Sequence, residues 1–140
     1  MSKIVAIDYG EKRIGIALTD DTKTIAFPHK VIQADKSPEK SAKKVADEIR
    51  SEQFSIEKII IGLPLLLSGL EGPMAKQVKE FGRILESELN LKIEYMDERL
   101  SSKGADVLMK DAKFTRKKRT KHLDAMSAVV LLQTYLSRCP

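Results

Sequence analysis

The chain contains no tryptophan and a single cysteine, Cys139, which stands next to the C-terminus. One cysteine cannot form an internal disulfide, so the composition favours a reducing compartment. The longest apolar run, IIIGLPLLL, is broken by Gly62 and Pro64. It is much shorter than the roughly 20 residues needed to cross a bilayer. The N-terminus also lacks the apolar segment of a signal peptide. These absences predict a cytoplasmic protein with neither a disulfide framework nor a membrane span.

Internal repeats, low-complexity tracts and Pro/Gly/Ser-rich linkers are also absent from the 140 residues. A chain of this length favours one domain and can bury a core without metal or disulfide cross-links. Hydrophobic residues make up 42% and charged residues 32%, which is typical of a globular protein. We therefore expect residues 1–140 to form a single globular domain.

Positive charge is concentrated in one segment near the C-terminal end. The formal net charge is +5, and the segment 113–122, KFTRKKRTKH, contains no acid. Two interpretations stay open for this segment: a solvated loop, or an arm that contacts phosphate groups. Phe114 lies within it and could stack on an exposed base. The candidate phosphate contacts are Arg116, Lys117, Lys118, Arg119 and Lys121.

Hydrophobic periodicity predicts five strands and four helices. The strands are expected at about 3–8, 13–18, 24–32, 58–64 and 91–99. The helices are expected at about 37–54, 72–89, 102–110 and 122–136. Ser37 and Pro38 suit the cap and the first turn of the first helix. Pro28 marks the third strand as an edge strand, because proline has no N–H to donate to a neighbour.

The order of these elements predicts an α/β fold with a mixed five-stranded sheet. The first three strands follow one another closely and are expected to pair as antiparallel hairpins. The later strands are separated by helices, which implies parallel pairing and right-handed crossovers. We expect helices on both faces of the sheet.

Three carboxylates far apart in the sequence are predicted to meet. Asp8 ends the first strand and Glu98 ends the fifth, and ligands collect at the carboxyl ends of parallel strands. Asp124 lies on the apolar stripe of the last helix, where an acid is unusual. Asp97 is a weaker candidate, because strand alternation directs it and Glu98 to opposite sides. Other interpretations are a turn-forming Asp8, a surface Glu98 paired with Arg99, and Asp124 as a helix cap.

Acids brought together repel one another unless cations neutralise them. Mg²⁺ and Mn²⁺ prefer oxygen ligands. Two such ions about 4 Å apart can activate a water and stabilise the leaving oxygen of a phosphodiester. Lys12 and Arg13 follow Asp8 closely and are candidates to contact phosphate. His29 and His122 have no metal-ligand spacing around them in the sequence.

Four segments, in order, resemble the YqgF (RuvX-like) family: DYGEKRIGIALTD, IIGLPLLLSG, DERLSSKGA and DAMSAVVLLQTYL. The family has a ribonuclease-H-like fold, and its members are described as Holliday junction resolvases or pre-16S rRNA nucleases. The resemblance implies that Asp8, Glu98 and Asp124 are the acidic active-site set, with roles nearby for Lys12, Arg13 and Arg99. It also implies a partner that is ribosomal RNA precursor or branched DNA. The protein is expected to be a monomer or a homodimer.

The segment after GLP departs from the family pattern, because three leucines (65–67) stand where relatives often carry polar residues. We expect these leucines to pack under the following helix. The alternative is an apolar patch that binds a subunit or a partner.

Two other function classes remain open on the sequence. A nucleic-acid-binding module without catalysis, such as a ribosome-assembly factor, needs the basic segment but not the acids. A nucleotide-dependent phosphotransferase is the third hypothesis, because DYGEKRIG resembles the phosphate loop of sugar kinases and actin-like ATPases. Those proteins generally need two such domains.

Overall fold

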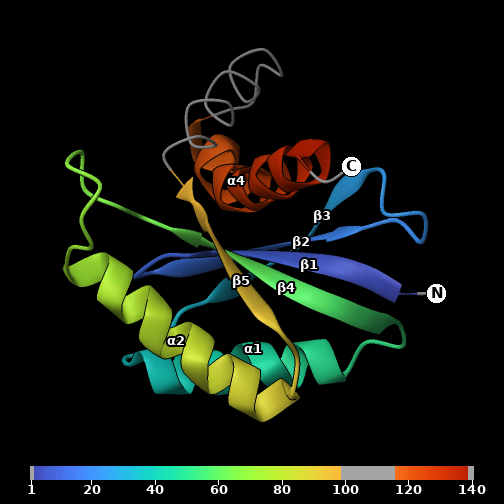
Figure 1. The fold of residues 1–140 in the computed structure, drawn as a ribbon, viewed down its shortest axis with the longest axis horizontal. Coiled ribbons are helices and arrows are strands. Elements are labelled where there is room, and N and C mark those ends of the chain that lie inside the picture. Colours follow the sequence, from blue (N-terminus) through green and yellow to red (C-terminus); the bar gives the residue numbers. More distant parts are fainter. Residues whose placement is uncertain (1, 99–115, 139–140) are drawn as a thin grey trace.

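A mixed five-stranded sheet forms the centre of the molecule (Figure 1). The computed structural model describes residues 2–98 and 116–138, with the backbone alone over 116–125. The strands are β1 (Ser2–Tyr9), β2 (Arg13–Thr19), β3 (Ala26–Gln33), β4 (Ser55–Leu63) and β5 (Ile93–Asp97). They lie side by side in the order β3-β2-β1-β4-β5.

Strand directions in the sheet follow the predicted pattern. β1 pairs antiparallel with β2, and β2 with β3. β1 pairs parallel with β4, and β4 with β5. β3 lies at the edge, as Pro28 predicted, and the register shifts where Pro28 pairs with Ala17. The predicted mixed sheet is confirmed.

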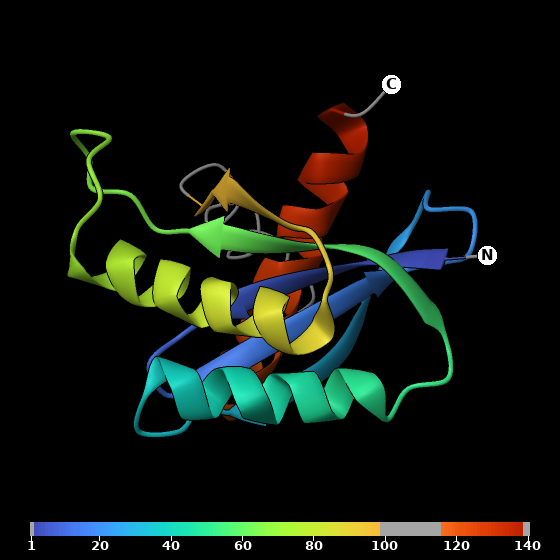
Figure 2. The same cartoon turned by 60° about the horizontal axis from the view of Figure 1, so that its bottom comes forward.

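Helices cover both faces of the sheet, also as predicted (Figures 1 and 2). α1 (Pro38–Arg50) and α2 (Pro73–Leu89) cover one face, and α4 (Arg116–Arg138) covers the other. α1 is capped as expected, because the Ser37 hydroxyl accepts a hydrogen bond from the Lys40 N–H at 3.2 Å. The helix predicted at 102–110 lies outside the described residues.

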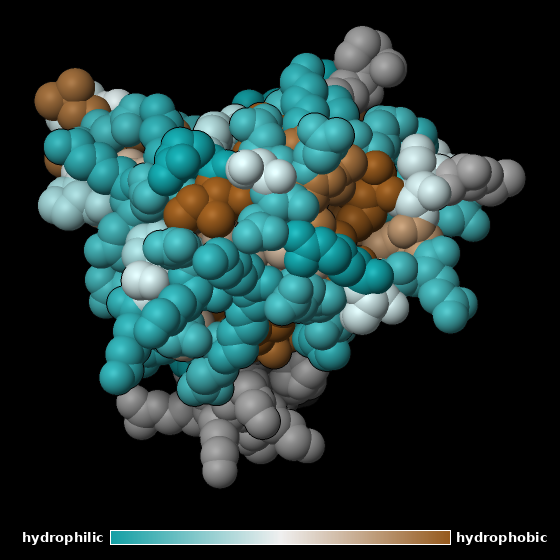
Figure 3. Space-filling model, turned by 90° about the horizontal axis from the view of Figure 1, so that it is seen from below, coloured by the Kyte–Doolittle hydropathy of each residue, from teal (hydrophilic) through white to brown (hydrophobic). Residues whose placement is uncertain are grey.

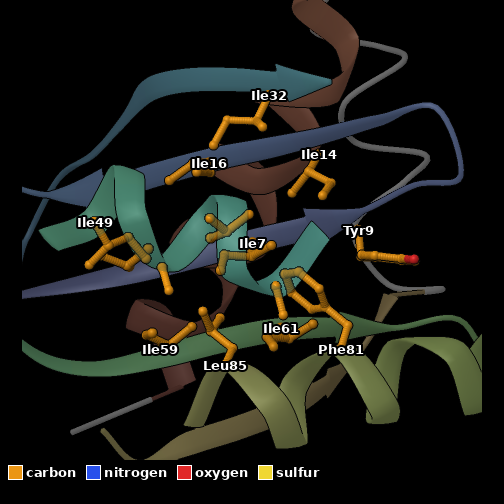
Figure 4. Close-up of a cluster of buried hydrophobic side chains, with 14 of the residues drawn as sticks. Ile7, Tyr9, Ile14, Ile16, Ile32, Ile49, Ile59, Ile61, Phe81 and Leu85 are labelled. Carbon is orange, nitrogen blue, oxygen red and sulfur yellow. The ribbon is translucent and has the colours of Figure 1, made fainter. Parts of the chain in front are cut away.

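The larger part of the core lies between the sheet and the pair α1 and α2 (Figure 4). Fully buried isoleucines of β1, β2 and β4 meet the apolar sides of the two helices. Phe81 of α2 packs on Tyr9 of β1, with 4.7 Å between ring centroids. The core residues of this face include Val5, Ile7, Ile14, Ile16, Ile59, Ile61, Val45, Ala46, Val78 and Leu85.

The second core cluster lies between the sheet and α4 and contains several small residues. Ala6 and Ala17 of the sheet and Ala128 of α4 are fully buried there. Small side chains allow a helix to approach a sheet closely. Leu131 and Leu132 fill the remaining space. α4 therefore lies directly on β1 and β2.

A polar contact fastens the C-terminal half of α4 to the sheet. The Lys58 ammonium of β4 donates to the Tyr135 hydroxyl at 2.6 Å and to Glu94 at 3.2 Å. The hydrogen bond to Tyr135, followed by that to Glu94, raises the pKa of Lys58 to about 12, although partial burial opposes the charged form. This contact joins β4, β5 and α4 at a half-buried position.

The start of α4 differs from the prediction. The helix begins at Arg116, six residues before the expected start at His122. Lysine and arginine are good helix formers, so a basic segment can continue a helix as readily as it forms a loop. Residues 116–121 are therefore the first turns of α4 and not a separate arm. Phe114 lies outside the described residues.

Within residues 2–98 and 116–138, no helix has both the length and the hydrophobicity needed to span a bilayer.

Candidate active site

Asp8 lies near the carboxyl end of β1, on the face of the sheet that α4 covers. Ala6, two residues earlier, belongs to the cluster packed under α4. Side chains alternate along a strand, so Asp8 and Ala6 share a face. Asp8 is half-buried and pairs with Gly15 of β2, which has no side chain.

Glu98 reaches the same face from the other side of the sheet. It follows β5 directly, and its side chain lies over Gly62 of β4. A Cβ atom on Gly62 would stand 3.5 Å from the Glu98 carboxyl carbon and 3.4 Å from the Leu131 side chain of α4. Glu98 therefore lies over Gly62, between β4 and α4, where a side chain longer than alanine would meet it.

The strand register brings Asp8 close to this space. β1 and β4 are parallel, and Ile7 pairs with Ile61. The next step of that register sets Asp8 beside Gly62, on strands about 4.8 Å apart. Residues that are ninety positions apart in the sequence thus direct carboxylates to one small region of the α4 face. The sequence interpretation missed the position of Gly62 beside the acids, since it treated this residue only as a break in an apolar run.

Asp97 is separated from this group, as alternation predicted. Met96 belongs to the cluster under α4, so Asp97 faces the opposite side, and it pairs with Leu63 at the end of β4. Glu98 stands again on the side of Met96. The β5 end therefore contributes one acid to the α4 face.

Arg13 and Lys12 lie at the same edge as Asp8. Arg13 is two residues before Gly15, the partner of Asp8, so it projects from β2 toward the α4 face. Lys12 is exposed in the turn that joins β1 to β2. That turn requires Gly10, because a Cβ atom there would lie 2.6 Å from the Arg13 carbonyl oxygen. The turn therefore holds two cations beside the carboxylates.

Asp124 lies within α4, four residues before the buried Ala128 and seven before Leu131. Its side chain is outside the described part of the chain, so its place in the group stays a prediction. The backbones of Arg116, Lys117, Lys118, Arg119 and Lys121 belong to the first turns of α4. Arg99 lies outside the described residues.

The donor chemistry of this edge suits a hard divalent cation. Asp8 and Glu98 offer carboxylate oxygens, the ligands that Mg²⁺ and Mn²⁺ prefer. Gly62 has no side chain to separate the two acids, and Arg13 contributes positive charge on the same face without being a ligand. The residues present therefore fit a divalent-cation site.

A second group of possible metal ligands lies on the opposite face of the sheet. His29 of β3 and Glu48 and Glu52 of the α1 region bring donor atoms within 4.8 Å of one another. No metal-ligand spacing marks His29 in the sequence, because these neighbours come from a different element. Glu52 shares a hydrogen bond with His29 at 2.9 Å, and Lys30 binds Glu48 at 2.8 Å. These pairs already compensate both carboxylates, so we do not assign a function to the group.

Two of the three leucines after GLP, Leu66 and Leu67, do not pack under α2 as expected, and Leu65 is half-buried. Leu67 is 99% exposed and Leu66 is 51% exposed, whereas the expectation placed them in the core. Residues 65–71 instead fold back on themselves, with an antiparallel bridge between Leu65 and Glu71. This short hairpin carries the leucines away from the sheet (Figures 1 and 2).

Solved structures share this architecture over almost the whole chain. The Holliday junction resolvase of fowlpox virus superposes with a TM-score of 0.60 at 17% identity, covering 99% of each chain. Thermus thermophilus RuvC in complex with a Holliday junction substrate superposes with a TM-score of 0.58 at 11% identity, covering 99% of this chain and 96% of that chain. At such identities the likeness concerns the fold. The predicted ribonuclease-H-like fold is confirmed.

Sequence relatives identify the family. The family model RuvX, described as Holliday junction resolvase, matches residues 2–138. A protein of Protochlamydia amoebophila named "Putative pre-16S rRNA nuclease" is 39% identical over 143 residues, covering 99% of this chain and 95% of the relative. One of the same name from Syntrophomonas wolfei is 39% identical over 136 residues, covering 96% and 93%. The chain belongs to the RuvX family, as its motifs predicted.

Proposed function

We propose that this protein is a divalent-metal-dependent endonuclease that hydrolyses phosphodiester bonds in nucleic acid. The observation that carries the proposal is the placement of Asp8 and Glu98 on one face of one sheet edge, on either side of Gly62. Carboxylate oxygens at the carboxyl ends of neighbouring parallel strands are the ligands that Mg²⁺ and Mn²⁺ prefer, at the edge where such sheets bind ligands. The match to the RuvX family supports the same conclusion.

Each side chain has a role in this proposal. Asp8 and Glu98, joined by Asp124 from α4, bind Mg²⁺ or Mn²⁺ through carboxylate oxygens. When bound, the ions supply a water of lowered pKa and stabilise the leaving oxygen. Arg13 and Lys12 hold the scissile phosphate next to the acids and offset its charge.

We propose that further basic residues hold the nucleic acid. We assign this role to Arg99 and to the basic first turns of α4, residues 116–121. Contacts of this kind are largely independent of sequence and weaken as salt concentration rises.

The substrate that we propose is precursor 16S ribosomal RNA, because the names of the relatives state it. Cleavage at its 5′ end is what the resemblance to the family implies. This would place the protein in ribosome biogenesis in the cytoplasm, as one domain over residues 1–140, either monomeric or homodimeric. A four-way DNA junction is the second candidate, since the description of the family model names it.

A cleavage assay tests the proposal. The purified chain is incubated with a precursor rRNA fragment and with a DNA four-way junction, each with and without Mn²⁺. We expect metal-dependent cleavage of one substrate, and we expect Asp8→Asn to lower the rate by about 10²–10³ or more, since one electrostatic stabiliser at the reacting centre is worth that much. Nucleic-acid binding should persist in the variant.

Two outcomes would contradict the assignment. Undiminished cleavage by Asp8→Asn would remove Asp8 from the mechanism. Tight binding of nucleic acid without any cleavage would favour the assembly-factor hypothesis. A thermal-shift measurement with ATP tests the phosphotransferase hypothesis, because stabilisation by ATP is expected only of a nucleotide-binding protein.

A further inference from the structure

Residues 65–71, the leucine hairpin, form a closed turn that projects from the end of β4 (Figures 1 and 2). Leu65 and Glu71 form an antiparallel bridge at its base. The Leu66 N–H donates to the Leu70 carbonyl at 2.9 Å, and the Gly69 N–H donates to the Leu66 carbonyl at 2.8 Å. Gly69 adopts a positive φ of 86°, which glycine permits without strain. The hairpin is therefore internally hydrogen-bonded and not a loose loop.

The tip of the leucine hairpin is apolar and exposed. Leu67 is 99% exposed, Leu70 68% and Leu66 51%. The space-filling view shows this apolar cluster standing out at the upper left of a mostly polar surface (Figure 3). Single exposed leucines are ordinary, but three on one projecting turn are characteristic of a contact surface.

The hairpin follows the end of β4 that lies at the candidate site. It begins three residues after Gly62, over which the Glu98 carboxylate lies. An ion pair of 2.6 Å between Glu71 and Lys79 fixes its second strand to α2. A nucleic acid bound at Asp8 and Glu98 therefore has the hairpin beside it, held by both β4 and α2.

The chemistry of the tip favours nucleobases over a protein partner. A stable protein interface takes about 20–30 residues a side, and this tip offers three leucines. The segment 65–71 contains no cation, so it is unsuited to phosphate. Apolar side chains that meet nucleic acid insert between neighbouring bases and unstack them, which bends or opens the helix.

We propose that the leucine hairpin is a wedge that inserts Leu67 into a base step of the substrate next to the cleaved phosphodiester. The inference rests on the proposed nuclease function and adds to it a requirement for helical substrate whose bases can be separated. Leu70 and Leu66 flank the inserted side chain and exclude water from the opened step.

Fluorescence of 2-aminopurine tests the wedge, because this base brightens when it is unstacked. The probes are a DNA four-way junction and an RNA duplex with a single-stranded 5′ extension, labelled at the base pairs flanking the branch or the duplex end. The protein is the full chain carrying Asp8→Asn, so that the probes stay intact. It is compared with the same chain carrying in addition Leu67→Ser, Leu67→Phe or Ile25→Ser.

We expect binding to raise the fluorescence, and Leu67→Ser to abolish the rise and weaken the affinity about tenfold or more, as loss of one buried leucine side chain implies. Leu67→Phe should retain the rise. Ile25→Ser is the matched control, because Ile25 is another exposed apolar residue, 52% exposed, adjoining the distant edge strand. It should behave like the unsubstituted protein.

Equal fluorescence and affinity for Leu67→Ser and its parent would overturn the wedge. A change from dimer to monomer in light scattering, with unchanged base unstacking, would also overturn it and make the hairpin a contact between copies. If wild-type protein cleaves while Leu67 has no effect, only the wedge fails. If neither probe is bound at all, the proposed function fails together with it.

Discussion

The space above Gly62 gives the sharpest test of the candidate site. Alanine at this position places its Cβ atom 3.4 Å from Leu131 and 3.5 Å from Glu98, which is ordinary van der Waals contact. Valine adds methyl groups that extend about 1.5 Å beyond Cβ, one bond length further. Gly62→Val must therefore displace Glu98, Leu131 or both, whereas Gly62→Ala need not.

Gly62→Val and Gly62→Ala should differ in both stability and activity. Overpacking of this kind costs about 1–3 kcal/mol of unfolding free energy. A shift of about 1 Å in a catalytic group can lower the rate about 10²-fold. We expect Gly62→Val to lose activity to that extent and to bind Mn²⁺ more weakly, and Gly62→Ala to stay close to wild type.

The assays are urea denaturation, cleavage rate at saturating Mn²⁺, and Mn²⁺ binding by calorimetry. Ala46→Val serves as the control, because Ala46 is fully buried in the cluster under α1 and α2, on the face away from Asp8. It should lose similar stability and keep its rate. Wild-type cleavage and metal affinity in Gly62→Val would refute the reasoning, because Glu98 would then act nowhere near this space.

Two further predictions concern the scaffold around the site. Gly10→Ala should lower the unfolding free energy by about 1–3 kcal/mol in urea denaturation, because its Cβ atom would lie 2.6 Å from the Arg13 carbonyl oxygen; unchanged stability would mean that the turn is not held as described. Lys58→Met should cost about 1.5–3 kcal/mol near neutral pH, the range for a hydrogen bond to a charged group. Because folding raises the pKa of Lys58 from 10.5 to about 12, the stability that this lysine contributes is complete below pH 10.5 and is lost as the pH rises toward 12. The difference between wild type and Lys58→Met in denaturant midpoint should therefore shrink over that interval, and a difference that stays constant with pH would contradict the assigned contact.

Much of the fold could be predicted from local patterns. Apolar runs around Ile7 and Ile61 predicted buried strands, because the apolar pattern is a property of the strand itself. The proline of β3 predicted an edge strand, because proline has no N–H to donate. Ser37 and Pro38 marked the start of α1 for the same local reason. The start of α4 was missed because the basic residues 116–121 carry no apolar periodicity. They nevertheless have strong helix propensity and include no residue that breaks a helix.

The leucines after GLP show where local patterns fail. A run of apolar residues next to a helix usually packs beneath it, and this was the expectation for Leu65, Leu66 and Leu67. The exposure of Leu66 and Leu67 depends on the path of the chain, which closes between Leu65 and Glu71 and leaves the sheet. The surroundings of His29 could not be predicted either, since its neighbours Glu48 and Glu52 come from the α1 region, about twenty residues away in sequence.

The sequence by itself determined the elements, the mixed sheet and the family, because strand alternation, helix periodicity and ordered motifs are written along the chain. It also supplied the acids as candidates. Only the tertiary structure decided that Asp8 and Glu98 share one face and that Gly62 makes room between them. This proximity arises from the strand register and from the packing of α4 on β4. Both bring together residues whose separation in the sequence does not indicate contact.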